Sequence, residues 1–313
     1  MHTNAHTENS TTCANVIRSD RLTSENAPSN DGETSSKAQL DAFLPIHADY
    51  QTHHEFLHRS PDTWVSAVGI SSLNGGAALD GVSGNLGNAF DQQVLHRARH
   101  RADFIVVGAE TVRAEGYEFE PITEPEVLAL RRSLGQTDTP RFAIPSRSLQ
   151  LTNPESIVGA DDQPTIILTT APRKPSTPHQ APQITTDEAR SWQDNYDHLA
   201  SLGFEILVLD DVTPPTIINS LRELTPASRN GCHISVEGGP SWYSRFIAAS
   251  CVDELLLTLA PVITDNETPL ISLSESGADP QWSSQWSSQW CRLVSTTISD
   301  SHLFLRYFLD SRR

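Results

Sequence analysis

The segment VEGGPSWYSRF, at residues 236–246, carries the strongest chemical signal in the chain. An apolar strand runs into Gly238-Gly239-Pro240, and a helix is expected to begin near Ser241. Two glycines allow a sharp turn that a ligand can approach closely, and the N-terminus of the following helix favours an anion. Glu237 would project from the strand end into the same crevice. The pattern predicts a phosphate cradle beside a carboxylate, with a plain tight turn as the alternative.

Two further glycine-containing segments follow apolar runs: SSLNGGAALDGVSGNLG at residues 71–87 and VVGAETVRAEGY at residues 106–117. The first predicts a substrate-covering loop or a simple flexible excursion. The second lacks the second glycine of a GxGxxG fingerprint, and the chain contains no GxxxxGK[ST], HExxH, GxSxG or CxxC motif. An ordinary Rossmann site, a P-loop, a zinc protease, a nucleophile elbow and a zinc deaminase are therefore unsupported.

A histidine cluster precedes these segments and offers His54 and His58 at helical i,i+4 spacing, a possible metal pair. The neighbourhood lacks a cysteine or carboxylate set apart from Glu55, so a solvated connector is the favoured interpretation and no metal is expected. The full cluster is His47, His53, His54 and His58.

Strands must position these segments. Apolar runs such as TWVSAVGISSL, RADFIVVGAET, FEILVLD and HISVEGG recur without strict alternation, which is typical of strands covered on both faces. Helices are predicted at residues 88–100, 187–201, 215–224 and 241–250, so the chain is expected to be an α/β protein with a mostly parallel sheet. The final strands, near 254–263 and 302–309, have no clear helix between them, which predicts an antiparallel edge. The repeat QWSSQWSSQW at 281–290, with Trp282, Trp286 and Trp290, is interpreted as a surface insertion.

Composition limits the kind of partner. The 313 residues include 22 Lys and Arg against 39 Asp and Glu, a formal net charge of −17. Such a charge argues against nucleic acid and anionic membranes as partners, because both are polyanions. The chain lacks an apolar run of membrane-spanning length and a signal-peptide pattern, so a cytoplasmic location is expected. We expect a disordered polar tail over residues 1–45, a polar connector over 46–61 and one domain over 62–313.

Taken together and in order, SSLNG at 71–75, RARHRADFIVVGAETVRAEGY at 97–117, VEGGPSWYSRFIAASCVDELLLTLAPVI at 236–263 and LFLRY at 303–307 resemble a known family. The chain is similar to the reductase domain of the bifunctional riboflavin-biosynthesis deaminase–reductase, and more closely to the stand-alone pyrimidine reductase family, over about residues 62–309. The resemblance implies a dihydrofolate-reductase-like fold, NADPH as hydride donor, a phosphoribosylamino-pyrimidine substrate and a homodimer.

The resemblance also implies roles for individual residues. Glu237 and Asn74 fall on catalytic positions, and Ser83, Arg99 and Glu237 fall where the family contacts substrate. Arg99 is suited to gripping a phosphate with two hydrogen bonds. Arg147 is a candidate for the 2′-phosphate of NADPH. The positions implied for the dinucleotide are Ser71, Gly108, Thr111, Glu115, Ser146, Gly238, Gly239, Pro240, Ser241, Trp242 and Tyr243.

Two positions depart from the family pattern. Asn74 stands where the family usually has Asp, which removes a charge, and Asn85 stands where the bifunctional enzymes have Trp. Two other functions therefore stay open: reduction of dihydrofolate or another pterin by the same fold, and binding of NADP without catalysis.

Overall fold

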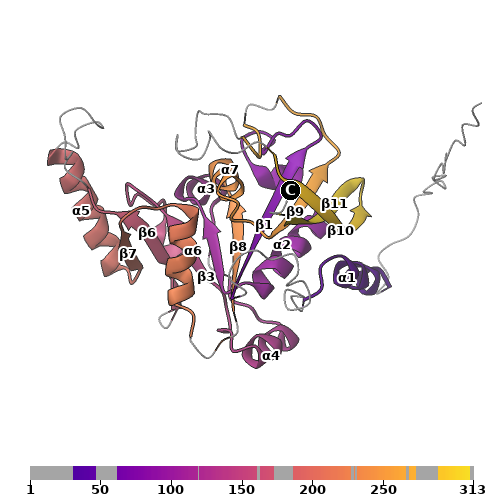
Figure 1. The fold of residues 1–313 in the computed structure, drawn as a ribbon, viewed down its shortest axis with the longest axis horizontal. Helices are drawn as coiled ribbons and strands as arrows, with labels where there is room; N and C mark the ends of the chain where they lie inside the picture. Colours follow the sequence, from indigo (N-terminus) through magenta and orange to yellow (C-terminus); the bar gives the residue numbers. More distant parts are fainter. Residues whose placement is uncertain are drawn as a thin grey trace, which may run out of the picture.

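The computed structural model describes residues 31–46, 62–118, 120–160, 163–172, 186–226, 229, 231–265, 268–272 and 288–310. In this part of the chain one sheet has the strand order β10-β11-β9-β1-β8-β2-β3-β6-β7 (Figure 1). Its strands are β1 (Thr63–Ser72), β2 (Phe104–Val107), β3 (Arg141–Pro145), β6 (Ile166–Thr170), β7 (Glu205–Leu209), β8 (Cys232–Gly238), β9 (Glu254–Ala260), β10 (Trp290–Ser299) and β11 (His302–Asp310). A separate short pair joins β4 (Gly159–Ala160) to β5 (Gln163–Pro164).

The sheet is parallel from β9 to β7, and β11 runs antiparallel to β9. This arrangement confirms the predicted dihydrofolate-reductase-like architecture, a mostly parallel sheet with an antiparallel edge. The sequence did not predict β10, which pairs antiparallel with β11 at the edge. Its residues are largely exposed, so the apolar signal that revealed the buried strands is weak there.

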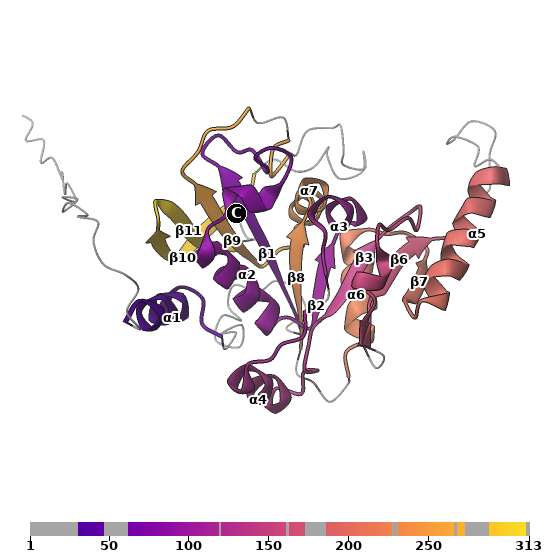
Figure 2. The ribbon, with the colours of Figure 1, turned by 180° about the vertical axis from the view of Figure 1, so that it is seen from behind.

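Helices cover both faces of the sheet, and the two views agree on their placement (Figures 1 and 2). One face carries α6 (Pro214–Glu223) and α7 (Pro240–Ala248), and the other carries α1 (Asp31–Phe43), α2 (Ala89–Arg101), α3 (Ala109–Glu115) and α5 (Thr186–Ser201). Each face of the sheet packs against its own apolar core, and successive side chains of the short β2 point to opposite faces. Phe104 and Val106 face α6 and α7, whereas Ile105 and Val107 face α3 and α5. The four predicted helices are confirmed within two residues of their expected starts, and α3 and α4 (Pro125–Ser133) were not predicted.

Local sequence explains where the helices near the site begin. Helix α2 is capped by Asn88, whose side-chain oxygen accepts a hydrogen bond from the Asp91 N–H at 2.9 Å. Helix α7 has Gly239 as its N-cap and Pro240 in its first turn, a position where proline loses no hydrogen bond. Helix α3 ends at Gly116, which adopts the left-handed conformation that glycine tolerates.

The expected disordered tail over residues 1–45 is wrong for residues 31–44, because residues 31–43 form α1 and its end is buried. Leu40, Phe43 and Leu44 pack with Phe90 and Phe304, from α2 and β11, in one apolar cluster. Only a few large apolar residues make this contact, and the rest of the segment is polar, so its composition did not indicate a packed helix. Residues 1–30, the histidine cluster and residues 281–287 of the tryptophan repeat lie outside the described residues. No helix in the described part of the chain has the length and apolarity that a membrane crossing requires.

Candidate active site

A large cleft opens where the parallel strands end. Strand β8 continues into α7 on one face of the sheet, whereas its neighbour β2 continues into α3 on the other. Adjacent connections that leave toward opposite faces create a crevice at the carboxyl ends of the strands. The cleft there has a volume of about 2480 Å³, compared with roughly 300–1,000 Å³ for an ordinary ligand pocket. It therefore has room for an extended ligand together with a second, smaller one.

Two glycine turns bring α3 and α7 together at the floor of this cleft. The Gly108 N–H donates a hydrogen bond to the carbonyl oxygen of Gly238 at 2.8 Å, and the peptide bond between Gly238 and Gly239 is cis. A Cβ added to Gly108 would lie 2.7 Å from Cδ1 of Trp242, and one added to Gly239 would lie 2.5 Å from Oγ1 of Thr111. Neither position has space for a side chain, so both glycines are required for the close approach of the two helices.

The cleft collects most of the residues predicted for the dinucleotide and for the substrate, from segments that are distant in the sequence. Ser83 and Glu115 meet directly, because the Ser83 N–H donates to Oε1 of Glu115 at 2.9 Å. Ser146 is buried at the end of β3, and its hydroxyl accepts a hydrogen bond from the Leu149 N–H at 3.1 Å. The predicted residues that line the cleft are Ser83, Arg99, Gly108, Thr111, Glu115, Ser146, Arg147, Glu237, Gly239, Pro240, Ser241, Trp242 and Tyr243.

Ser71, Asn74, Asn85 and Gly238 are not among the lining residues. The Ser71 hydroxyl donates to the Ser72 carbonyl oxygen at 2.7 Å, and the Asn85 amide donates to the Leu79 carbonyl oxygen at 3.0 Å. Asn74 braces the loop after β1 against the segment after β9: its amide nitrogen donates to the Thr264 carbonyl oxygen at 2.8 Å, and its amide oxygen accepts from the Thr264 N–H at 3.1 Å. An amide can fill both roles, whereas a carboxylate has no donor for the Thr264 carbonyl. These contacts give Asn74 a structural task at the loop.

Glu237 lies at the end of β8 with its side chain only 1% exposed, and it is ion-paired with Arg99 from α2. The Arg99 Nη2 donates to Oε2 of Glu237 at 2.8 Å, and Nε donates to Oε1 at 3.0 Å. The structure thus brings together two residues that the sequence assigned separately to substrate. The guanidinium fork that was expected to grip a phosphate is engaged by Glu237 instead.

The surroundings of this pair shift the protonation of neighbouring groups. Burial alone would lower the pKa of Arg99, but the Glu237 carboxylate raises it overall, so the guanidinium stays charged. Burial, and then the charge of Glu237, raises the pKa of Tyr117 well above its usual range. Burial likewise raises the pKa of Tyr243, whose ring lies 3.1 Å from the position that a Cβ on Gly238 would take. Both phenols therefore remain protonated, and that of Tyr117 donates to the carboxylate.

Two cleft residues escaped the sequence analysis. Tyr117 donates from its hydroxyl to Oε2 of Glu237 at 3.3 Å, although it was visible only as the last residue of the 106–117 segment. Asp91 lies in the first turn of α2, and burial raises the pKa of its carboxyl group, an effect that a hydrogen bond with Thr258 opposes. No local motif distinguishes Asp91 from an ordinary first-turn acid, so only the fold reveals it.

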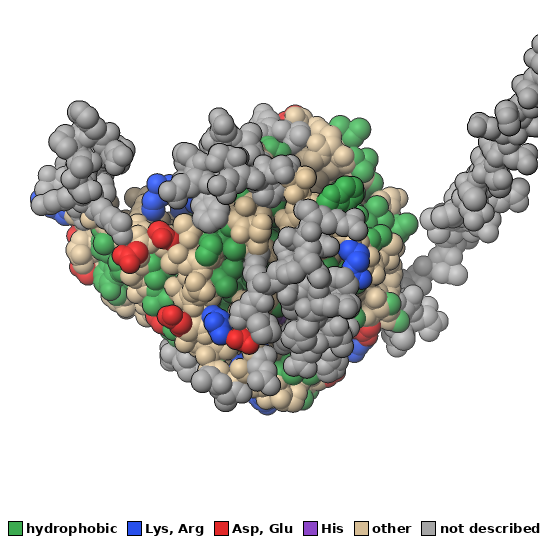
Figure 3. Space-filling view, in the orientation of Figure 1, with side chains coloured by type: hydrophobic (Ala, Val, Ile, Leu, Met, Phe, Trp, Pro, Cys, Tyr) green, Lys and Arg blue, Asp and Glu red, His purple; other side chains and the backbone are tan. Residues whose placement is uncertain are grey.

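Side chains of both charges line the cleft, and the acidic ones are Asp91, Glu110, Glu115, Glu118, Glu120, Asp210, Asp211 and Glu237. Among the described residues, the cleft is lined by Arg99, Arg113, Arg147 and Arg245. The guanidinium group of Arg245 lies over the Trp242 ring at 5.0 Å from its centroid. On the face of the molecule in Figure 3, acidic and basic side chains are scattered singly among polar and apolar ones. Each of these four guanidinium groups has the chemistry to pair with an anionic group of a ligand. The described residues contain no cluster of three or more His, Cys, Asp or Glu side chains able to hold a metal ion.

A family profile and a related enzyme both match much of this chain. The profile of the RibD C-terminal domain matches residues 63–291. The 2,5-diamino-6-ribosylamino-4(3H)-pyrimidinone 5′-phosphate reductase of Aquifex aeolicus is 28% identical over 207 residues, which cover 65% of this chain and 76% of that protein.

Solved structures give a further comparison. A pyrimidine reductase-like protein from Corynebacterium diphtheriae is 28% identical, with a TM-score of 0.62 over 79% of this chain and 91% of that one. RibD of Acinetobacter baumannii shares the fold, with 16% identity and a TM-score of 0.52 over 79% of this chain and 58% of that one. This chain belongs to the RibD C-terminal domain family of pyrimidine reductases.

Proposed function

We propose that the chain is an NADPH-dependent reductase that reduces the ribose of a phosphoribosylamino-pyrimidine to a ribityl chain. The candidate substrates are 5-amino-6-(5-phosphoribosylamino)uracil and its relatives that differ in deamination or in the phosphate. The observation that carries the proposal is the single cleft in which the Gly108–Gly239 cradle adjoins the Glu237–Arg99 pair. The Aquifex aeolicus relative is a reductase of a ribosylamino-pyrimidinone phosphate, which supports the same substrate class.

The residues around the two glycine turns fit a nicotinamide dinucleotide. The cradle has no space for side chains at Gly108 and Gly239, and the N-terminus of α7 faces the cleft, which suits a pyrophosphate. Ser146 and Arg147 lie at the end of β3, where a charged guanidinium could meet a 2′-phosphate. When bound, such a cofactor supplies the hydride, so the protein's own contribution is binding, orientation and charge.

The substrate would occupy the part of the cleft lined by α2 and the end of β8. Ser83, Arg99 and Glu237 line this region, as does Asp91. Within this proposal the hydride goes to C1′ of the sugar, through an open-chain imine, and Glu237 contacts the sugar. We also propose that the chain forms a homodimer, which analytical ultracentrifugation would test.

The test is turnover by the full chain. NADPH oxidation is followed at constant enzyme with the phosphoribosylaminouracil, and separately with dihydrofolate, while nicotinamide fluorescence measures binding of NADPH and NADH. We expect turnover of the pyrimidine alone and tighter binding of NADPH. Glu237→Gln should lower kcat/KM by a factor of about 10² or more, because it removes the carboxylate and keeps the side-chain shape.

A matched control is Glu155→Gln, which changes an exposed carboxylate outside the cleft and should leave kcat/KM unchanged. Turnover of dihydrofolate alone would replace the substrate assignment with the pterin alternative. Binding of NADPH without turnover of either compound would favour a non-catalytic role, and absence of binding would remove the dinucleotide assignment.

A further inference from the structure

The two carboxylate oxygens of Glu237 are unequally engaged. Oε2 is approached by three donors: the Arg99 Nη2 at 2.8 Å, the Arg99 Nε at 3.1 Å and the Tyr117 hydroxyl at 3.3 Å. Among the described residues Oε1 accepts only from the Arg99 Nε, at 3.0 Å. A carboxylate has roughly four acceptor sites over its two oxygens. The contacts therefore saturate Oε2 and leave acceptor capacity on Oε1.

Tyr117 is itself held in place by aromatic contacts. Its ring meets that of Phe142 edge-on, with 6.0 Å between centroids and an interplanar angle of 78°. The Arg99 guanidinium lies 5.4 Å from the Tyr117 centroid and 5.9 Å from that of Phe142. The two rings thus support Arg99 through cation–π contacts while the phenol reaches the carboxylate.

The charged groups around Glu237 come from several elements. Arg99 projects from α2 and Tyr117 from the loop after α3, while the buried Tyr243 lies on α7. Glu115 interacts with Tyr117 electrostatically, and Glu120 lies 4.0 Å from the Arg99 Nη1. Arg99 and Tyr117 are the groups that donate hydrogen bonds to Glu237, and donors to an ionised carboxylate stabilise its charged form.

We propose that Tyr117 and Arg99 are positioning residues that hold Glu237 ionised, with Oε1 as the atom that accepts a hydrogen bond from the substrate. Glu237 then acts as an acceptor and as a counter-charge for positive charge that develops on the substrate. It does not act as the proton donor. The identity of the substrate rests on the proposed function, whereas the arrangement of the three side chains does not.

This assignment also changes the task of Arg99. Its Nε and Nη2 are committed to Glu237, whereas Nη1 lies 4.0 Å from the exposed carboxylate of Glu120. An anionic group of the substrate would meet Nη1 in place of Glu120. An anion bound at Nη1 and the ionised Glu237 would then share the guanidinium of Arg99. This arrangement favours a substrate that carries both a phosphate and a hydroxyl donor.

The discriminating variant is Tyr117→Phe, which keeps the ring and its contacts with Arg99 and Phe142 but removes the hydroxyl. The matched control is Tyr307→Phe on β11, a partly buried tyrosine outside the cleft. Arg99→Lys is the second variant, because it keeps the charge and loses the fork. Thermal melting of each full-length variant checks that the fold is retained.

The first readout does not depend on turnover. Carbon-13 NMR of protein labelled at the glutamate carboxyl carbon follows the titration of Glu237, and the resonance missing in Glu237→Gln identifies it. Removing a donor should let the carboxylate take up a proton at higher pH, so the titration midpoint should rise by up to about one pH unit in Tyr117→Phe. The rise should be larger in Arg99→Lys and absent in Tyr307→Phe. An unchanged midpoint in both cleft variants would overturn the proposal.

The second readout is the pH dependence of kcat. In the wild type an ionised Glu237 requires activity to fall on the acid side, and this fall should begin at higher pH in Tyr117→Phe, with kcat at neutral pH lower by up to about tenfold. Activity that instead depends on a protonated Glu237, and falls on the alkaline side, would overturn the proposal. If the wild type turned over no pyrimidine, the proposed function would fail while the NMR titration still decided the role of Tyr117.

Discussion

Gly239 occupies a space that any other residue would overfill. Its φ of −74° is ordinary for every residue, so conformation does not require glycine here. The constraint is the Thr111 hydroxyl, 2.5 Å from the position that a Cβ would take, whereas the Thr111 Cβ is 3.9 Å away. The contact between the two turns is therefore specific to one oxygen atom, and it can be relieved by removing that atom.

Gly239→Ala should cost about 1–3 kcal/mol of unfolding free energy, the usual range for an overpacked site, and it should weaken NADPH binding by separating α3 from α7. Adding Thr111→Ala should recover most of the lost stability, since the remaining contact is an ordinary van der Waals distance. Urea unfolding and a fluorescence titration of the two single variants and the double variant measure both effects. Strictly additive losses in the double variant would contradict this steric explanation.

At the scale of elements, α1 is the feature that extends the chain beyond the matched family domain. The family profile begins at residue 63, whereas α1 covers residues 31–43. Phe43 is 2% exposed, and its ring meets Phe304 of β11 edge-on at 6.2 Å between centroids. Polar contacts add to this packing: the Arg97 side chain donates to the Leu44 carbonyl oxygen at 3.0 Å, and the Ser295 hydroxyl donates to that of Phe43 at 2.7 Å. The helix therefore covers apolar surface of α2 and β11 in the folded chain.

Phe43→Ala should destabilise the protein by about 3–5 kcal/mol, the cost of removing a buried aromatic side chain. Lys37→Ala, on the same helix, removes only an exposed ion pair with Glu126 and should leave the melting temperature unchanged. Urea unfolding monitored by circular dichroism compares the two variants. Equal stability of Phe43→Ala and the wild type would mean that α1 does not contribute to the folded domain.

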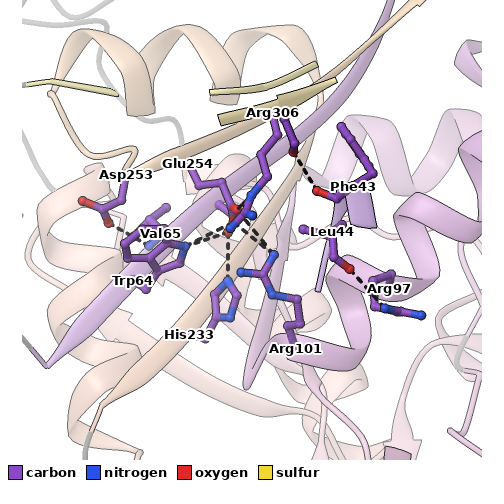
Figure 4. A network of polar contacts seen from close by, with 12 residues as sticks. Phe43, Leu44, Trp64, Val65, Arg97, Arg101, His233, Asp253, Glu254 and Arg306 are labelled. Carbon is purple, nitrogen blue, oxygen red and sulfur yellow. Dashed lines mark hydrogen bonds and ion pairs between the residues drawn. The ribbon is translucent and has the colours of Figure 1, made fainter. Parts of the chain in front are cut away.

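At the scale of the whole molecule, a buried ion network joins five elements at the amino ends of the parallel strands, opposite the cleft (Figure 4). Glu254 at the start of β9 is fully buried and accepts from Arg101 at the end of α2 and Arg306 on β11. Ser66 of β1 also donates to Glu254, and its hydroxyl contacts Nε2 of His233 on β8 at 2.9 Å. Removing one side chain of this network would leave a buried charge without its partner, which is strongly destabilising. We therefore expect the intact network to hold the strand ends in register.

This network makes stability depend on pH. Burial, and then the charge of Arg101, lowers the pKa of His233 to about 3 from its usual 6.5. Burial would raise the pKa of Glu254, but Arg101 and Arg306 lower it overall. Below about pH 6.5 the unfolded chain takes up a proton on His233 that the folded chain refuses, and at lower pH the same holds for Glu254. Both groups therefore stabilise the fold at neutral pH, and their contribution is lost as the pH falls.

The free energy of unfolding should accordingly decrease as the pH is lowered from about 7 toward about 4. His233→Gln should flatten the part of this decrease that lies just below pH 6.5, because a neutral side chain binds no proton in either state. The exposed His198→Gln serves as the control and should leave the slope unchanged. Urea unfolding at a series of pH values measures the slope, and a wild-type stability that rose on acidification would contradict the assignment.

Much of the fold could be predicted from local patterns. The buried strands of a parallel sheet are continuous apolar runs, and β1, β2, β7 and β8 were visible for that reason. The exposed strand β10 and the mostly polar helix α1 were missed because neither has a strong apolar period. In the site, the Gly238-Gly239-Pro240 turn and Glu237 were predicted, since glycines before a helix carry a local signal.

What the sequence by itself determined is most of the strands of the sheet, the glycine turns between them and the family to which they belong. The tertiary structure alone decided which side chains meet. Arg99 pairs with Glu237 across 138 residues, and Asn74 bonds to Thr264 across 190. The first contact arises because the sheet inserts β8 between β1 and β2, which places the end of β8 beneath α2, and the second arises because β1 pairs with β9 on its other side. Hydrogen bonds require positions defined to within a few tenths of an ångström, and no local pattern encodes a distance between strands brought together by the order of a sheet.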